Sequence, residues 1–359
     1  MLPPTRLYKA SLSGSGNGVS TTLPEVSRRS CPDCADDTCH AGAVTQPVLF
    51  GGPAPGQDPE LDLVTARLYT LDPSGNRVAA VLRETLDQLL DGRRSGRWDY
   101  AQLHKTEKTH MGTLVEINFH REFDFVDGDA TDYRIGGVEV DCKFSQVIGG
   151  WEIGPEIVGH LCLVIWARDS ASRWQAGLVR ATADRLRTAT NRDAKRRLTP
   201  TATADVRWLW PDHGRLQENT LLHLEPGVRA AIMRAQGANG RHGQARLFAL
   251  CRLVQGRILN RTLIETVGWG LDDPLKRMRS NGGARDALRP EGLLVLGHHG
   301  SDQRIADELG LPTPVRGEFL SVRVAPARQG DLRPTTLIAG GRWVAAEADD
   351  PIAAAPDLR

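Results

Sequence analysis

A two-glycine turn constrains the folding of this chain more than any other short stretch. Gly136-Gly137 signals a two-residue β-hairpin loop, and the residues on both sides suit strands. With this loop, residue 135 pairs with 138, 134 with 139 and 133 with 140, so Asp132 lies directly opposite Asp141. Alternation along the second strand predicts two faces, with Glu139, Asp141 and Lys143 on one and Val138, Val140, Cys142 and Phe144 on the other.

The opposed aspartates predict a cation site. Directly opposed strand residues have Cβ atoms about 4.5–5.5 Å apart, so two carboxylates there repel each other unless a cation lies between them. Two carboxylates around a hard divalent ion, with Lys143 beside it, suit phosphodiester hydrolysis. The spacing Asp-x8-Asp-x-Lys is short, however, and a solvated strand face without a site is the alternative interpretation.

A helix predicted before the hairpin offers a third acid. Residues 109–122 have apolar side chains at three-to-four spacing, namely Met111, Leu114, Val115 and Phe119. Glu116 lies inside this run, where it either pairs with a base such as His120 or adds a carboxylate to the cation site. A helix acid, a strand Asp and Asp-x-Lys follow one another in the PD-(D/E)xK nuclease fold, although Thr131 stands where that name has proline.

Longer stretches of the sequence resemble one family. The matching segments are residues 86–92, 104–117, 140–145, 159–167, 191–200, 209–219, 242–246, 282–285 and 288–292. They follow one another in order over roughly residues 58 to 353. On these segments the chain is similar to the NaeI family of type II (type IIE) restriction endonucleases.

The resemblance implies a Mg²⁺-dependent enzyme with the catalytic set Glu116, Asp132, Asp141 and Lys143. Asp132, Asp141, the Cys142 backbone carbonyl and Glu116 are the implied metal ligands. The implied enzyme is a homodimer that cleaves double-stranded DNA at a GCCGGC-like palindrome and binds a second copy of that site as an effector. A cell carrying it needs a cognate DNA methyltransferase.

The sequence predicts an α/β (α+β) protein with two domains. We expect a disordered extension at residues 1–57, an endonuclease domain at 58–208, a linker at 209–217 and an effector-DNA-binding domain at 218–359. In the endonuclease domain, residues 161–166 form an apolar run typical of a buried central strand, and 78–90 predict a helix. Together these elements indicate a mixed sheet with flanking helices.

The predicted C-terminal domain is a CAP-like winged helix-turn-helix. Residues 243–254 predict one helix with Leu247, Leu250, Cys251 and Val254 facing inward, Asn260 predicts the cap of a second helix that extends to Val267, and 293–296 predict a strand. Either Pro274–Arg279 or Ala284–Leu288 would supply the recognition helix. Arg277, Arg279 and Arg285 are the candidates for DNA contact, because arginine can pair with guanine through two hydrogen bonds.

The net charge and the cysteine content of the chain exclude few functional classes of protein. The net charge is only +1, but residues 229–289 carry 12 Lys/Arg against 4 Asp/Glu, which fits phosphate binding. Cys31, Cys34, Cys39 and His40 could bind zinc, although free thiols in a tail are the expectation. No stretch resembles a membrane span or a secretory signal, so we expect a cytoplasmic protein without a membrane partner.

Two other classes stay open at this point. One is a DNA-binding regulator that has lost catalysis, although the complete set of Glu, Asp, Asp and Lys argues against it. The other is a repair or structure-specific nuclease of the same fold, which would not require a second DNA-binding domain. Incubation with Mg²⁺ and plasmid DNA distinguishes all three classes.

Overall fold

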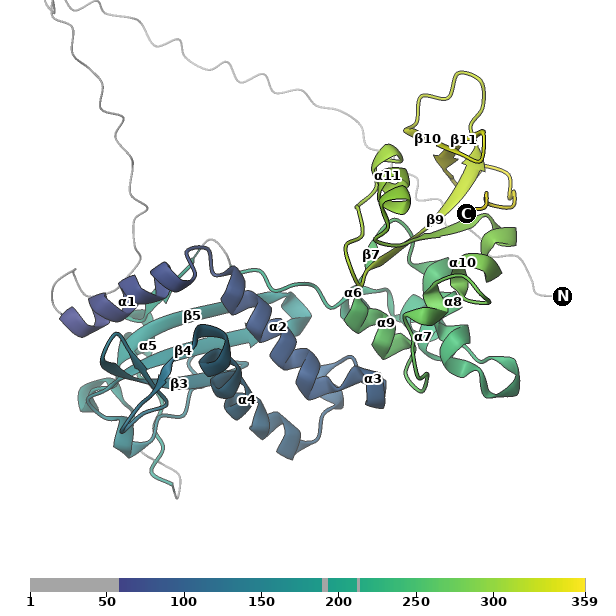
Figure 1. Cartoon of the computed structure of the whole chain (residues 1–359). Coiled ribbons are helices and arrows are strands. Elements are labelled where there is room, and N and C mark those ends of the chain that lie inside the picture. Colours follow the sequence, from purple (N-terminus) through teal and green to yellow (C-terminus); the bar gives the residue numbers. More distant parts are fainter. Residues whose placement is uncertain (1–57, 189–192, 212–213, 359) are drawn as a thin grey trace, which may run out of the picture. The chain divides into compact units, whose positions relative to one another are not determined.

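The computed structural model describes residues 58–188, 193–211 and 214–358. The extension predicted over residues 1–57, with the zinc candidates Cys31, Cys34, Cys39 and His40, lies outside the described residues. The described chain is a mixed α+β protein with two sheets (Figure 1), and both belong to one compact unit, Leu49–Arg359. Over this part of the chain no helix has the length and apolar character that crossing a membrane requires.

The first sheet has six strands in the order β1-β2-β3-β4-β5-β6. They are β1 (Val126–Asp127), β2 (Tyr133–Ile135), β3 (Val138–Ser145), β4 (Leu161–Arg168), β5 (Arg173–Arg180) and β6 (Arg207–Leu209). β3 and β4 run parallel and the other neighbours antiparallel, so the predicted mixed sheet is confirmed. Residues 161–167 of β4 are all buried, as predicted for a central strand covered on both faces.

Three helices pack against one face of this sheet (Figure 1). They are α1 (Pro59–Leu71), α2 (Asn76–Leu90) and α4 (Lys105–Phe123), with the single-turn α3 (Gly92–Ser95) after α2. α1 begins where the Asp58 side chain accepts a hydrogen bond from the Leu61 N–H at 3.1 Å. α2 confirms the helix predicted over residues 78–90, and its buried stripe includes Leu82, Leu86 and Leu89.

The opposite face of the sheet is covered by irregular chain and α5 (Pro200–Ala204). Trp151 is fully buried there, and its indole N–H donates to the Ile165 carbonyl of β4 at 2.7 Å. Cys162 and Val164 pack in this second core, while Leu161, Leu163 and Ile165 belong to the first. Successive side chains of β4 point to opposite faces of the sheet, and each face is covered by a core, so residues on both faces are apolar.

The second sheet has the order β10-β11-β9-β7, and β8 also pairs with β9. Its strands are β7 (Ile258–Leu259), β8 (Leu293–Leu296), β9 (Phe319–Pro326), β10 (Thr335–Ile338) and β11 (Gly341–Ala345). The helices of this half are α6 (Thr220–His223), α7 (Pro226–Met233), α8 (His242–Leu253), α9 (Arg261–Val267), α10 (Ala284–Ala287) and α11 (Gly300–Glu308).

Several predictions for this half are confirmed. α8 covers the helix predicted over residues 243–254, and its inward residues are buried. The Asn260 side chain caps α9 by accepting from the Leu263 N–H at 2.9 Å. β8 spans residues 293–296, as predicted.

The predicted recognition helix is not confirmed. Pro274–Arg279 contains only a short 3-10 turn, Lys276–Met278, and α10 is a single turn of four residues. The chain between them passes through left-handed backbone at Asn281 and Gly282, which have φ of 64° and 83°, so no helix can continue there. The described residues therefore do not establish the winged helix-turn-helix.

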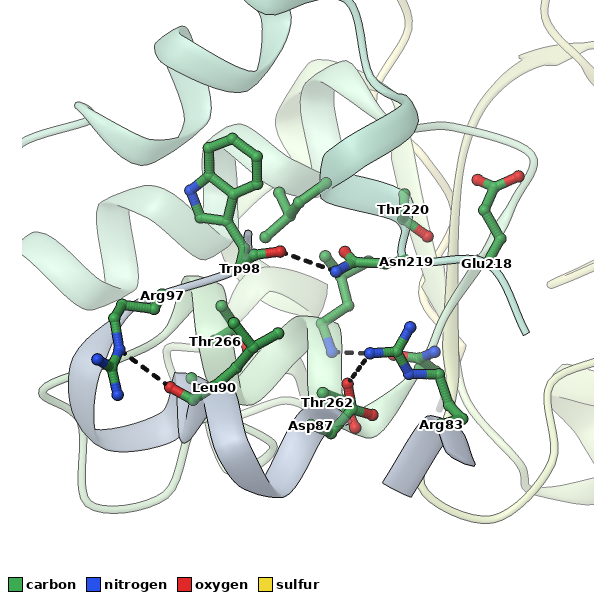
Figure 2. A pocket seen from close by; sticks show the side chains of 14 residues that line it. Arg83, Asp87, Leu90, Arg97, Trp98, Glu218, Asn219, Thr220, Thr262 and Thr266 are labelled. Atoms are coloured by element: carbon green, nitrogen blue, oxygen red, sulfur yellow. Dashed lines mark hydrogen bonds and ion pairs between the residues drawn. The ribbon is translucent and has the colours of Figure 1, made fainter. Parts of the chain in front are cut away.

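A small pocket lies where α2 and α3 meet residues of the C-terminal half (Figure 2). Its volume is about 30 Å³, which is room for roughly two water molecules and none for a nucleotide. Arg83 of α2 lines it and pairs with Asp87 at 2.6 Å and Asp169 at 2.5 Å. Asn219 also donates to Asp169 at 3.2 Å, so this cluster connects the two halves of the chain.

The residues predicted as a linker are in part packed against the first sheet. Leu209 ends β6, and Trp210 and Leu216 are buried in the core that α1, α2 and α4 share with the sheet. The Gly214 carbonyl accepts from the Trp174 N–H of β5 at 3.0 Å. The domain boundaries themselves remain a prediction.

Candidate active site

The hairpin forms with the predicted register over three pairs, but the expected Asp132–Asp141 pair is not part of the ladder. Tyr133 pairs with Val140, Arg134 with Glu139 and Ile135 with Val138, and Gly136 and Gly137 have φ of 62° and 86°, as a two-glycine loop requires. The ladder ends at the Tyr133 pair, so Asp132 lies one residue beyond it. Its Oδ2 accepts a hydrogen bond from the Cys142 N–H at 2.7 Å. Because Cys142 lies between Asp141 and Lys143 in β3, this bond holds the Asp132 carboxylate next to both residues.

Asp141 and Lys143 form a buried ion pair on the same face of β3. The Lys143 ammonium donates to Asp141 Oδ1 at 2.7 Å and lies 2.6 Å from Oδ2, yet Oδ2 is buried and makes no well-formed hydrogen bond. The Asp141 side chain is only 3% exposed. Burial raises the pKa of Asp141 to about 7 against the opposing effect of Lys143, with repulsion from Asp132 adding to the rise.

Lys143 is placed to serve both aspartates. Its ammonium lies 3.9 Å from Asp132 Oδ2 and donates to the Cys142 carbonyl at 3.2 Å. Burial alone would lower the pKa of this lysine, but Asp141 and Asp132 outweigh burial and raise it. Lys143 therefore stays charged and holds the two carboxylates together.

Glu116 projects from α4, the helix that the sequence predicts. Burial raises the pKa of its carboxyl, and the Asp132 charge adds to this rise while Lys143 opposes it. Among the described residues its carboxylate makes no hydrogen bond or ion pair. The structure thus brings Glu116 within electrostatic range of the hairpin, and the Tyr133 hydroxyl donates to its backbone carbonyl at 2.7 Å. We call Glu116, Asp132, Asp141 and Lys143 the hairpin site.

The hairpin site fits a hard divalent cation with few protein ligands. Within the described ranges, no three His, Cys, Asp or Glu side chains converge closely enough to form a metal cage. Mg²⁺ does not need one, since it keeps several waters and is commonly bound by one or two carboxylates together with substrate phosphates. Asp141 Oδ2 is a buried carboxylate oxygen that makes no well-formed hydrogen bond among the described residues and lies 2.6 Å from the Lys143 ammonium, so its chemistry suits such an ion.

Sequence reasoning missed the role of Glu139. Strand alternation predicts that Glu139 lies on the face of Asp141 and Lys143, but it indicates no function for this residue. In the structure its carboxylate accepts hydrogen bonds from the loop that precedes Asp132. These bonds lower the pKa of Glu139 to about 2, the Asp129 backbone N–H being the largest cause. Strand alternation is the one sequence pattern that points to Glu139, because it predicts that this residue lies on the same face as Asp141 and Lys143.

The three arginines proposed for DNA contact are in different environments. Arg277 and Arg279 are exposed on either side of buried Met278. Arg285 instead pairs with buried Asp302, and its Nε donates to the Val295 carbonyl at 3.0 Å. Its guanidinium is therefore engaged inside the fold, which leaves Arg277 and Arg279 as the accessible candidates.

A mixed sheet that carries Asp141 and Lys143, with Asp132 next to the hairpin and Glu116 on a neighbouring helix, is consistent with a nuclease-like fold. The sequence model of a family described as "Restriction endonuclease NaeI" matches residues 62–354. The chain is also 55% identical over 311 residues to the type II restriction enzyme NaeI of Lentzea aerocolonigenes, which covers 86% of this chain and 96% of that protein. This chain therefore belongs to the NaeI family of type II restriction endonucleases, as its sequence predicts, and such enzymes are site-specific deoxyribonucleases.

Proposed function

We propose that this chain hydrolyses phosphodiester bonds of double-stranded DNA with Mg²⁺ bound at the hairpin site. Its target would be a G·C-rich palindrome similar to GCCGGC, with a second DNA site as allosteric effector. The observation that supports the metal most directly is Asp141, a buried carboxylate whose Oδ2 has no hydrogen bond and whose neighbours are a second aspartate and a lysine. Without a cation, a fold would gain little from such a cluster.

The residues divide the chemistry among them. Asp132, Asp141 and the Cys142 carbonyl would hold the ion, with Glu116 contributing from α4. When bound, Mg²⁺ polarises the phosphate and stabilises charge on the leaving oxygen. The Lys143 ammonium, which already contacts the Cys142 carbonyl and both aspartates, would orient the attacking water and neutralise the phosphate.

The C-terminal half would bind the effector DNA. In this proposal residues 58–208 form the catalytic domain, 209–217 the linker and 218–359 the effector domain. Exposed Arg277 and Arg279 support it, as does the basic excess of residues 229–289. The enzyme would act as a homodimer, because a palindrome presents the same half-site twice, and a cognate methyltransferase would protect the host DNA.

One digestion tests this function. Purified protein is incubated with Mg²⁺ and plasmid DNA carrying two GCCGGC sites, and the ends are mapped by sequencing. Discrete fragments that end at those sites are the expected result, with faster cleavage than on a plasmid carrying one site. An absence of cutting would instead indicate an inactive regulator, and cutting confined to damaged or branched DNA would indicate a repair nuclease.

A further inference from the structure

The Glu139 carboxylate accepts hydrogen bonds from the loop that leads to Asp132 and from Arg134, which follows it. Its donors are the backbone N–H groups of Asp129 at 3.0 Å, Ala130 at 3.1 Å and Thr131 at 3.1 Å, the Thr131 hydroxyl at 2.9 Å, and the Arg134 Nε and Nη2 at 3.2 and 3.1 Å. Both oxygens accept from the 129–131 loop, which is how a carboxylate fixes a short irregular segment. Because both oxygens already accept several hydrogen bonds, Glu139 is unavailable as a metal ligand.

The loop is also closely packed around this carboxylate. A Cβ added at Gly128 would lie against the Thr131 carbonyl and 2.8 Å from both Glu139 Oε2 and the Thr131 hydroxyl. Any side chain at position 128 would therefore displace the loop or the carboxylate. This lack of space is independent of the hydrogen bonds and shows that the loop and Glu139 fit each other tightly.

Asp132 needs this support more than its partners do. Asp141 and Lys143 lie within β3, where backbone pairing with β4 fixes their positions. Asp132 lies outside the strands, one residue beyond the last pair of the hairpin and directly after the loop. Its carboxylate is held by the hydrogen bond from the Cys142 N–H and by the more distant Lys143 ammonium at 3.9 Å.

We propose that Glu139 is a positioning residue, which holds the 129–131 loop so that the Asp132 carboxylate stays in place for the divalent cation. The proposal rests on the proposed function, since it assumes a cation at the hairpin site. Residues that orient a metal ligand typically contribute about 10- to 100-fold to metal affinity. Glu139 would act on the cation only through the loop and Asp132.

The test measures binding of Mn²⁺ alone, as free Mn²⁺ detected by electron paramagnetic resonance, without DNA or turnover. In Glu139→Gln one oxygen becomes an NH₂ group that faces backbone N–H donors, so Mn²⁺ should bind about 10-fold or more weakly. Gly128→Ala should weaken binding in the same direction, because it disturbs the same loop and leaves the charge of Glu139 unchanged. Glu291→Gln is the matched control, since Glu291 pairs with Arg252 at 2.7 Å and, within the described chain, makes no hydrogen bond or ion pair with the hairpin residues or the 129–131 loop.

The outcomes distinguish this inference from the proposed function. Wild-type affinity in Glu139→Gln, within about two-fold, would overturn the positioning role. Weak binding in Glu139→Gln together with normal binding in Gly128→Ala would also overturn it, because charge rather than loop position would then be the cause. If Asp141→Ala binds Mn²⁺ as well as the wild type, the metal site itself fails and this inference with it. Should Glu139→Gln not fold, Thr131→Val removes the hydroxyl that contacts Glu139 and the Tyr133 carbonyl, and it is expected to weaken Mn²⁺ binding several-fold.

Discussion

Two buried acid–base clusters in this molecule look alike and differ in what they leave unsatisfied. In the first, Arg83 lies between Asp87 and Asp169, with ion-pair distances of 2.6 and 2.5 Å. In the second, Lys143 lies between Asp132 and Asp141, at 3.9 and 2.6 Å. Each aspartate at the centre is only 3% exposed, so the burial of these two carboxylates does not distinguish the clusters, although Lys143 is 26% exposed and Arg83 only 7%.

The difference is in the acceptors. Both oxygens of Asp169 accept hydrogen bonds, Oδ1 from Arg83 and Oδ2 from Arg83 and Asn219. Asp141 Oδ2 lies 2.6 Å from the Lys143 ammonium but makes no well-formed hydrogen bond, and burial raises the pKa of Asp141 to about 7. Each cluster has one buried atom without a well-formed hydrogen bond, but in the first it is a donor, Arg83 Nε, and in the second it is a carboxylate oxygen, Asp141 Oδ2. Only the carboxylate oxygen can bind a cation, which is expected at a functional site and not in a cluster that joins two segments.

The largest effect is expected from the hairpin site. Asp141→Ala or Lys143→Ala should reduce DNA cleavage roughly a thousand-fold or more, because cation binding or phosphate neutralisation is lost at the reacting bond. DNA binding, measured by gel shift in Ca²⁺, should change little. Asp169→Asn is the comparison variant, and strong Mg²⁺-dependent cutting by either hairpin variant would contradict the assignment.

The Arg83 cluster should show the opposite profile. Arg83→Met leaves Asp87 and Asp169 buried without their cation, which typically costs about 3–5 kcal/mol of unfolding free energy. Urea unfolding would measure this loss. Mn²⁺ affinity of the folded variant should stay at the wild-type level, and a matching loss of metal binding would remove the distinction between the clusters.

The pH dependence should follow Asp141. Because its folded pKa of about 7 lies above the ordinary value of 3.8, stability from the protonated group is present below about pH 4 and is lost as pH rises toward 7. A divalent ion must displace that proton, so Mn²⁺ affinity should rise about 10-fold per pH unit up to pH 7 and then level off. A flat titration between pH 5 and 7 would show that Asp141 is not a ligand.

The smallest change in unfolding free energy is expected at an exposed ion pair, which serves as the solvent-exposed reference for the two buried clusters. Arg252 and Glu291 pair through two hydrogen bonds of 2.7 Å, but both side chains are more than 40% exposed. Solvent screening should keep the stability change of Glu291→Gln below about 1 kcal/mol. If Glu291→Gln lost as much unfolding free energy as Arg83→Met, burial would not determine how much an ion pair contributes to stability.

The two clusters also differ in how far the sequence predicts them. The hairpin register follows from Gly136-Gly137 and alternation, so the positions of Asp132, Asp141 and Lys143 were predictable from local chain geometry. The Arg83 cluster joins residues up to 136 positions apart, from Arg83 to Asn219, and no local pattern indicates such a meeting. Glu139 was missed for a similar reason, because its partners lie in an irregular loop without periodicity.

In the C-terminal half, local sequence patterns predict some elements correctly but not the recognition helix. Three elements could be predicted from the sequence because their own residues define them. They are α8 with its apolar spacing, α9 with its Asn260 cap and β8 with its apolar run. The recognition helix could not be predicted, since propensity cannot show that left-handed Asn281 and Gly282 interrupt the chain between two single turns. Short segments take their conformation from packing rather than from local preference.

The central claim is that the cation binds between the hairpin aspartates, and metal-directed cleavage of the protein tests it most directly. Fe²⁺ replaces Mg²⁺ and reduces added H₂O₂ to hydroxyl radicals at the bound metal, while ascorbate reduces the resulting Fe³⁺ back to Fe²⁺. The cut positions in the polypeptide are mapped by mass spectrometry. We expect cuts near Asp132 and along residues 139–143, suppressed by excess Mg²⁺ and absent in Asp141→Ala. Cuts confined to other acidic segments, or cuts at the hairpin that persist in Asp141→Ala, would contradict the account.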